Sequence, residues 1–159
     1  MTKDMRLKDL KLEAMWKTVW TSLMLVLMMS CKSDSEDIIP NVRFSAQINL
    51  DDPEYSGWST FIVKPDGLNP RIGVNGVAVY RFSDQAYYAF DLMCTHEHET
   101  PGYFFVEQMD RGDFTFECPE CGSQFIVATE DGSVIKGPAN WPLVKYKTSV
   151  SGNYLRIWN

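Results

Sequence analysis

The chain has 159 residues, a length suited to one domain, and a formal net charge of −6. This acidity argues against nucleic-acid binding, because attraction to phosphate requires clustered Lys and Arg side chains. With 45% hydrophobic and 23% charged residues, the composition is that of a globular protein and excludes a disordered or fibrous chain.

The N-terminal segment has the pattern of a secretory signal. A polar, Lys-rich stretch comes first, and an apolar run of about eleven residues follows from Val19 to Met29. A membrane-spanning helix needs about twenty apolar residues, so this run is too short to be one. A basic flank before a short apolar core predicts a signal peptide over residues 1–30. Met15 is an alternative start, since Lys17 would still supply the positive flank.

The end of this segment resembles the lipobox of bacterial lipoprotein signal peptides, in which a cysteine is lipidated and becomes the new N-terminus. The apolar run ends in Met28-Met29-Ser30-Cys31, with a small residue directly before the cysteine. The resemblance implies lipidation of Cys31 and a bacterial membrane-anchored lipoprotein, periplasmic or displayed on the outer-membrane surface. The alternative is a free Cys31 behind an uncleaved apolar anchor.

An acidic tether is expected over residues 31–41. Its start, Lys32 to Asp37, has too little apolar content to fold by itself. An acidic stretch directly after the lipidated cysteine also resembles the surface-export signal of Bacteroidetes lipoproteins.

From residue 42 to residue 159 the sequence is typical of an all-β domain. Apolar and polar residues alternate from Val42 to Leu50, which predicts a half-buried strand. Aromatic and β-branched runs separated by Gly, Pro, Asn and Asp predict further strands. These are expected at 60–64, 77–82, 87–93, 103–107, 114–117, 124–128, 144–148 and 154–158, with turns at Asn75-Gly76, Asp131-Gly132 and Ser151-Gly152-Asn153. Many short strands with turns between them predict a sandwich or barrel.

Cysteines and histidines in two short segments carry the most recognisable chemistry. Cys94-Thr95-His96 and Cys118-Pro119-Glu120-Cys121 each follow a predicted strand and run into a loop. Two loops that each offer two ligands at such short spacing suit four-point coordination of a single centre. If Cys31 is lipidated, three cysteines remain, and an odd number cannot all pair as disulfides within one chain.

Three alternatives remain open from the residues themselves. Cys118 and Cys121 could form a disulfide and leave Cys94 free, although this leaves His96 unexplained. His98 could replace His96 as a ligand, although the Cys-x-His spacing favours His96. Three thiolates and one imidazole suit either Zn²⁺ or an iron–sulfur cluster, so the donor set alone does not identify the metal.

The two segments resemble the cluster loops of Rieske proteins. Cys94-x-His96 is followed by Cys118-Pro119-x-x-Gly122-Ser123-x-Phe125, and Gly137-Pro138 with the final hairpin extends the likeness over roughly residues 75–159. The resemblance implies a Rieske-like β-sandwich whose small tip, about residues 91–128, binds a [2Fe-2S] cluster. It implies Cys94, His96, Cys118 and Cys121 as ligands, and Ser123 as a hydroxyl group that hydrogen-bonds a cluster sulfur.

The sequence departs from the Rieske pattern at one ligand. Cys121 stands where the family has its second histidine, and Gly122-Ser123 beside it fixes the register. Glu120 and Glu99 occupy the positions where some Rieske proteins have a disulfide, so that disulfide is absent. Phe125 replaces the family's usual Tyr, which removes one hydrogen bond to the cluster.

Together these features predict an electron-transfer or redox-sensing lipoprotein with a [2Fe-2S] cluster bound by three cysteines and one histidine. No general base, nucleophile or substrate pocket is visible in the sequence, so an enzyme is not expected. The alternative is a degenerate Rieske-like structural or binding module with a zinc site or no metal. The membrane, reached through Cys31, is one expected partner. A redox partner with a basic docking face is the other, because the segment from 94 to 121 is rich in acidic residues.

Overall fold

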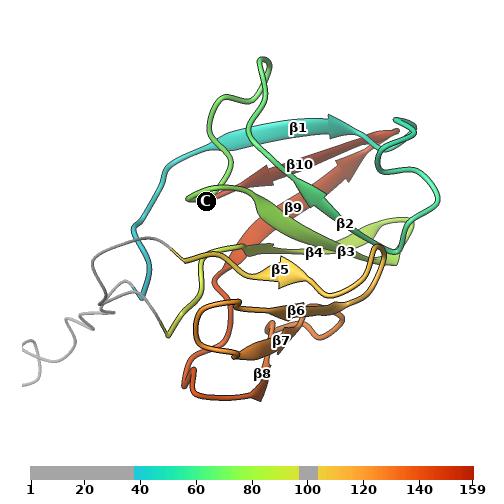
Figure 1. The fold of residues 1–159 in the computed structure, drawn as a ribbon. Coiled ribbons are helices and arrows are strands. Elements are labelled where there is room, and N and C mark those ends of the chain that lie inside the picture. Colours follow the sequence, from blue (N-terminus) through green and yellow to red (C-terminus); the bar gives the residue numbers. More distant parts are fainter. Residues whose placement is uncertain (1–37, 97–103) are drawn as a thin grey trace, which may run out of the picture. The chain divides into compact units, whose positions relative to one another are not determined.

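The computed structural model describes residues 38–96 and 104–159, and within these ranges the chain folds into ten β-strands without a helix. The strands form two antiparallel sheets, of six and four strands (Figure 1). The predicted all-β sandwich is confirmed. Since the described residues contain no helix, none of them forms a helix that could cross a membrane.

The larger sheet has the strand order β1-β10-β9-β4-β3-β2, with every neighbouring pair antiparallel. In β1, Ala46 and Ile48 are buried and their neighbours are exposed, as the alternation of the sequence predicts. The strands of this sheet are β1 (Ser45–Asn49), β2 (Thr60–Val63), β3 (Val77–Ser83), β4 (Ala86–Asp91), β9 (Lys145–Ser151) and β10 (Tyr154–Trp158).

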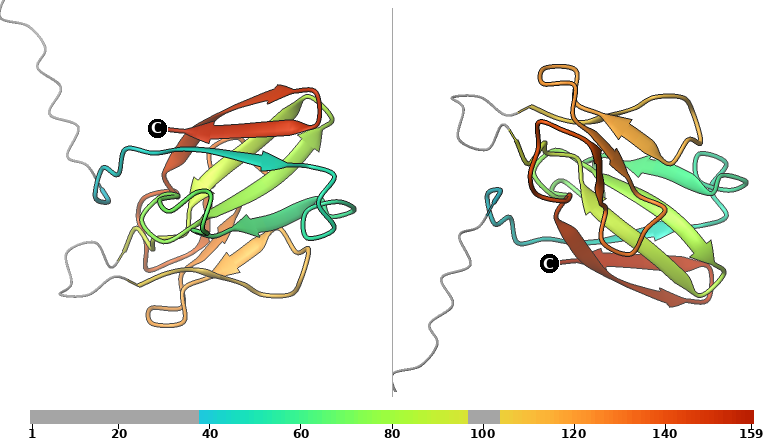
Figure 2. Two further views of the ribbon diagram at one scale, coloured as in Figure 1. Left: turned by 90° about the horizontal axis from the view of Figure 1, so that it is seen from above. Right: turned by 90° about the horizontal axis from the view of Figure 1, so that it is seen from below.

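The smaller sheet lies against one side of the larger sheet, as the two views of Figure 2 show. Its strands follow in the order β5-β6-β7-β8, so each connection joins neighbouring strands. They are β5 (Glu107–Gln108), β6 (Thr115–Glu117), β7 (Gln124–Ile126) and β8 (Val134–Lys136).

The core has two parts because the centre of the larger sheet is buried on both faces. On one face, Val79 and Ala89 join a cluster enclosed by the curl of the larger sheet itself. On the other face, Ala78 and Phe90 pack in a second cluster, which also contains Phe116 and other residues of the smaller sheet. Two of the predicted ligands, Cys94 and Cys118, belong to this second cluster. The predicted metal site therefore borders the core between the two sheets.

Two details of the strand prediction need correction. The strand expected at 103–107 is shorter and begins later, as β5, while Phe105 forms only an isolated bridge with Met93. Strand β8 was not predicted. Its residues Ile135 and Lys136 are exposed and Val134 is only half-buried, so apolar alternation gives little signal there.

Candidate metal centre

Three loops meet at one end of the smaller sheet, on the left in Figure 1. They are the loop after β4, the turn between β6 and β7, and the loop between β8 and β9. The Thr95 hydroxyl donates a hydrogen bond to the carbonyl of Trp141 at 2.5 Å. The N–H of Ala139 donates to Oγ of Ser123 at 2.8 Å. The third loop is thereby fixed to both cysteine-bearing loops.

The structure brings three of the four predicted ligands together. The Sγ atoms of Cys94 and Cys121 are 3.7 Å apart, and with Cys118 all three sulfurs lie within 4.8 Å of one another. Cys94 and Cys118 are completely buried, whereas Cys121 is partly exposed. All three are free thiols, so the alternative Cys118–Cys121 disulfide is not formed in this structure.

A tight turn presents the second pair of cysteines. Gly122 donates its N–H to the carbonyl of Cys118 at 2.8 Å, and Cys118 donates to the carbonyl of Ser123 at 2.9 Å. Gly122 has a φ of 70°, which glycine adopts without a steric cost. The backbone N–H groups of Cys121 and Glu120 act to lower the pKa of the Cys118 thiol. This turn therefore supplies both thiols and hydrogen-bond donors that stabilise a thiolate.

The first cysteine is held by pairing of the loop after β4 with a neighbouring segment. Cys94 donates its N–H to the carbonyl of Phe104 at 2.8 Å, and Val106 donates to the carbonyl of Leu92 at 2.7 Å. The two bonds keep an otherwise irregular loop in a strand-like course up to the ligand.

His96 is exposed, and the group of mutually close ligand atoms consists of the three cysteines. Its backbone N–H acts to lower the pKa of the Cys94 thiol. Its role as fourth ligand remains a prediction. His98, Glu99 and Cys31 lie outside the described residues.

Burial governs the protonation of the thiols. It raises the pKa of both Cys94 and Cys118 above the ordinary thiol value, and the backbone N–H donors oppose this only in part. Without a metal these thiols stay protonated at neutral pH. Metal binding must therefore release protons, as it does at other thiolate sites.

Ser123 is fully buried beside the thiols, and its Oγ lies 3.0 Å from Sγ of Cys121. One lone pair of this oxygen already accepts the Ala139 N–H. When Cys121 is a thiolate, the hydroxyl hydrogen of Ser123 is therefore free to point at its sulfur. The structure thus places the Ser123 hydroxyl beside Cys121, whose role as a ligand remains a prediction.

The donor set fits a thiolate-bound metal. Two thiolates at 2.3 Å from one tetrahedral ion lie about 3.8 Å apart, close to the Cys94–Cys121 separation. Cysteine thiolates are also the usual ligands of iron–sulfur clusters. Sequence reasoning missed the Thr95–Trp141 link, because no local pattern connects residues so far apart in the chain.

Comparison with known proteins assigns the class of this site. The profile of the Rieske [2Fe-2S] domain matches residues 63–147, which is more than half of the chain. The chain belongs to the Rieske [2Fe-2S] domain family. Rieske domains bind a [2Fe-2S] cluster, and the cysteine group that could hold the metal lies within the matched residues. Among curated protein sequences, none matches the chain significantly.

Solved structures similar to this chain include other Rieske proteins. A chain from the complex of reduced oxygenase and oxidised ferredoxin in carbazole 1,9a-dioxygenase is 24% identical, with a TM-score of 0.48 over 74% of this chain and 94% of that one. The plasma-membrane Rieske protein of Synechocystis PCC 6803 is 24% identical, with a TM-score of 0.44 over 64% and 87%. The carbazole 1,9a-dioxygenase ferredoxin of Nocardioides aromaticivorans IC177 is 22% identical, with a TM-score of 0.45 over 74% and 95%.

Proposed function

We propose that this chain is an electron-transfer or redox-sensing lipoprotein and not an enzyme. Cys94, His96, Cys118 and Cys121 would hold its [2Fe-2S] cluster. The observation that carries this proposal is the convergence of three thiols, within 4.8 Å of one another, inside the residues that match the Rieske domain.

The cluster would supply a site that accepts and releases single electrons. The chain's own contribution is to hold and shield that site. Burial of Cys94 and Cys118 keeps water from their sulfurs, and the N–H donors of the turn after β6 stabilise negative charge on Cys118. Cys121 is the partly exposed ligand, so the side of the centre that it occupies is open to a redox partner.

The test is the optical and elemental analysis of the full chain, purified without oxygen. We expect visible absorption, with two iron and two sulfide per chain, and loss of both in Cys94→Ser and Cys118→Ser. Cys31→Ser serves as the control, since the proposed centre does not use this residue. A colourless protein without iron would contradict the proposal.

Zinc is the second candidate, and the sulfur spacing favours it. In a two-iron cluster the ligands on opposite irons are separated by both irons and their bridging sulfides. Cys121, which replaces the family's second histidine, lies 3.7 Å from Cys94, a distance that suits ligands of one ion. The same elemental analysis distinguishes the two, because a zinc module contains one zinc per chain and no sulfide.

We also propose that lipidation of Cys31 anchors the protein to a bacterial membrane, in the periplasm or on the outer-membrane surface. The support is the sequence Met28-Met29-Ser30-Cys31 after a short apolar run. A lipoprotein carries more than one acyl chain, and stable anchoring needs more than a single chain. Cys31→Ala should release the protein from the membrane fraction or leave its precursor uncleaved. Normal processing with full membrane retention would contradict the proposal.

A further inference from the structure

A buried carboxylate lies just upstream of the first cysteine. Asp91 ends strand β4, three residues before Cys94, and is completely buried. Its Oδ1 accepts the N–H of Met93 at 2.7 Å. Its Oδ2 accepts the N–H of Val74 at 2.8 Å and the hydroxyl of Tyr146 at 2.7 Å. One side chain therefore joins the loop that leads to Cys94, the turn before β3, and strand β9.

The donors around this carboxylate are neutral. Among the residues that the structure describes, no Lys, Arg or His forms an ion pair with Asp91. Burial raises the pKa of Asp91 and that of Tyr146. A carboxyl group in such surroundings costs stability that an apolar side chain would not. What the Asp91 carboxylate contributes is its hydrogen bonds. They fix the relative position and orientation of the three segments.

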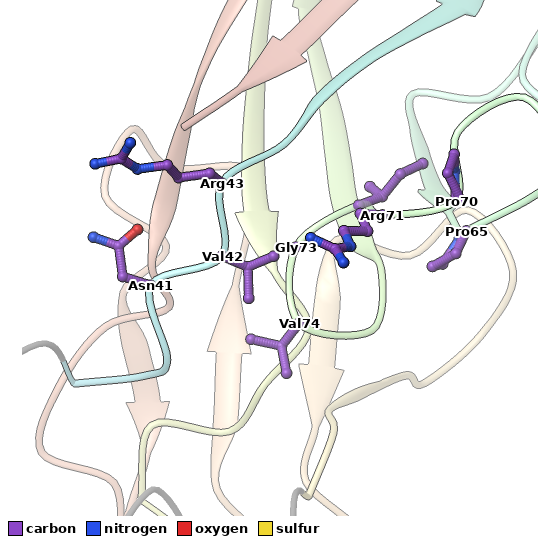
Figure 3. Close-up of a pocket in the computed structure, with 9 residues that line it drawn as sticks. Asn41, Val42, Arg43, Pro65, Pro70, Arg71, Gly73 and Val74 are labelled. Atoms are coloured by element: carbon purple, nitrogen blue, oxygen red, sulfur yellow. The ribbon is translucent and has the colours of Figure 1, made fainter.

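The turn before β3 is built around this carboxylate. Gly73 has a φ of 58°, and a Cβ atom added there would overlap Oδ2 of Asp91. In Figure 3, Gly73 and Val74 stand on the loop that faces Val42 across a cavity of about 580 Å³. The turn thus lines this cavity on one side and packs against Asp91 on the other.

We propose that Asp91 is a positioning residue for the metal centre. By holding Met93 and the Gly73–Val74 turn, it fixes the direction in which β4 ends and so places Cys94 beside Cys121. This inference rests on the proposed thiolate centre. Asp91 is not itself one of the proposed ligands. Its loss should therefore weaken metal binding without removing a donor atom.

Two glycines allow a matched test. Gly73 and Gly152 both have a φ of 58°, but a Cβ at Gly152 meets nothing within 4 Å. Gly73→Ala and Gly152→Ala therefore place a Cβ at the same φ, and only the former meets Asp91, together with the carbonyl oxygen of Gly76 at 3.0 Å. Asp91→Asn is the direct variant, since an amide has one acceptor oxygen where the carboxylate uses two.

The probe is cobalt(II) alone, added to the reduced, metal-free full chain. Thiolate-to-cobalt absorption reports how many sulfurs bind the ion. We expect Asp91→Asn and Gly73→Ala to bind cobalt about tenfold to 100-fold more weakly than the wild type, the usual loss for a residue that orients a ligand. Their absorption per bound ion should fall by about one third, because Cys94 is one of three thiolates. Gly152→Ala should match the wild type in both measurements. Equal behaviour of the two glycine variants, or unchanged binding by Asp91→Asn, would overturn the proposal.

A second measurement needs no metal. Oxidised glutathione should convert the adjacent thiols of Cys94 and Cys121 into a disulfide, with two glutathione thiols released. If Asp91 positions Cys94, this disulfide forms several-fold more slowly in Asp91→Asn and Gly73→Ala than in Gly152→Ala. Equal rates would overturn the positioning role. If the wild type forms the disulfide readily but binds no cobalt, the proposed metal centre fails while the positioning role stands.

Discussion

At the scale of single residues, Cys121 determines the charge of the proposed cluster. A thiolate in place of a neutral imidazole adds one negative charge, which favours the oxidised state. Rieske centres have potentials of about −150 to +300 mV, against about −400 mV for plant-type clusters with four cysteines. We expect the potential of this protein to lie between the two classes.

Cys121→His should therefore raise the potential towards the Rieske range. The pH dependence should become steeper at alkaline pH, because a second imidazole can lose a proton. Voltammetry on both proteins measures the change. A potential that stays constant or falls would show that Cys121 is not an iron ligand.

The three thiols should differ in reactivity when no metal is bound. Burial covers Cys94 and Cys118 and raises the pKa of both, whereas Cys121 is partly exposed. Since the thiolate is the reactive form, we expect iodoacetamide to label Cys121 first in the metal-free protein. Peptide mass spectrometry gives the order of labelling, and added metal should protect all three. Faster labelling of Cys94 would contradict the burial argument.

Asp91 should make stability depend on pH. Burial raises its pKa in the folded protein, and the hydrogen bonds from Tyr146, Met93 and Val74 oppose this only in part. The folded state therefore keeps the proton to a higher pH than the unfolded chain does. As pH rises from the ordinary carboxyl value through the raised value, the free energy of unfolding should fall.

Urea unfolding of the metal-free wild type and Asp91→Asn measures this, from about pH 4 to pH 7. The wild type should lose stability relative to the variant as pH rises. Asp66 and Asp131 have lowered pKa values and act in the opposite direction, but they do so in both proteins and cancel in the difference. Parallel curves would contradict the raised pKa of Asp91.

At the scale of elements, the turn before β8 depends on a close approach of Gly132 to the core. Its φ is 64°, and a Cβ there would lie 2.8 Å from the ring of Phe90. Gly132→Ala should destabilise the fold by about 1–3 kcal/mol, the usual cost of overpacking. Gly152→Ala, with a similar φ and open space, isolates the backbone contribution. Equal losses in urea unfolding would show that the Phe90 contact is unimportant.

The sequence predicts those elements whose signal is local. Strand β10 was predicted with the bounds that the structure shows, because its apolar residues alternate and a turn precedes it. Strand β8 was missed because two of its three residues are exposed. The spacing of Cys94, Cys118 and Cys121 in the sequence was enough to predict that they lie together at one centre. The role of Asp91 could not be predicted, because its partners Val74 and Tyr146 reach it only through the packing of separate strands.

At the scale of the whole molecule, acidic side chains lie near the metal centre in the chain. Glu107 pairs with Glu117, which directly precedes Cys118, and Glu120 lies between Cys118 and Cys121. Asp110, Asp113 and the cation Arg111, whose guanidinium lies 4.6 Å from the centre of the Trp58 ring, belong to the connection at the opposite end of β5 and β6. A basic electron-transfer protein should therefore associate with this chain, and the rate should fall as salt is added. Stopped-flow kinetics with basic and acidic partner proteins tests this. A rate insensitive to ionic strength would contradict a charged docking face.

The three thiols come from both sheets, and this affects which part of the protein unfolds first. Cys94 follows a strand of the larger sheet, whereas Cys118 and Cys121 belong to the smaller one. A bound metal is thus a further cross-link between the two sheets, in addition to the side-chain packing of the core and the backbone hydrogen bonds that join Leu92 and Cys94 to Val106 and Phe104. Without metal, we expect the smaller sheet to open before the larger one, so its amide hydrogens should exchange with solvent before those of β9 and β10. Metal should slow exchange most in β6 and β7, because ligand binding stabilises the states in which the sheets are joined.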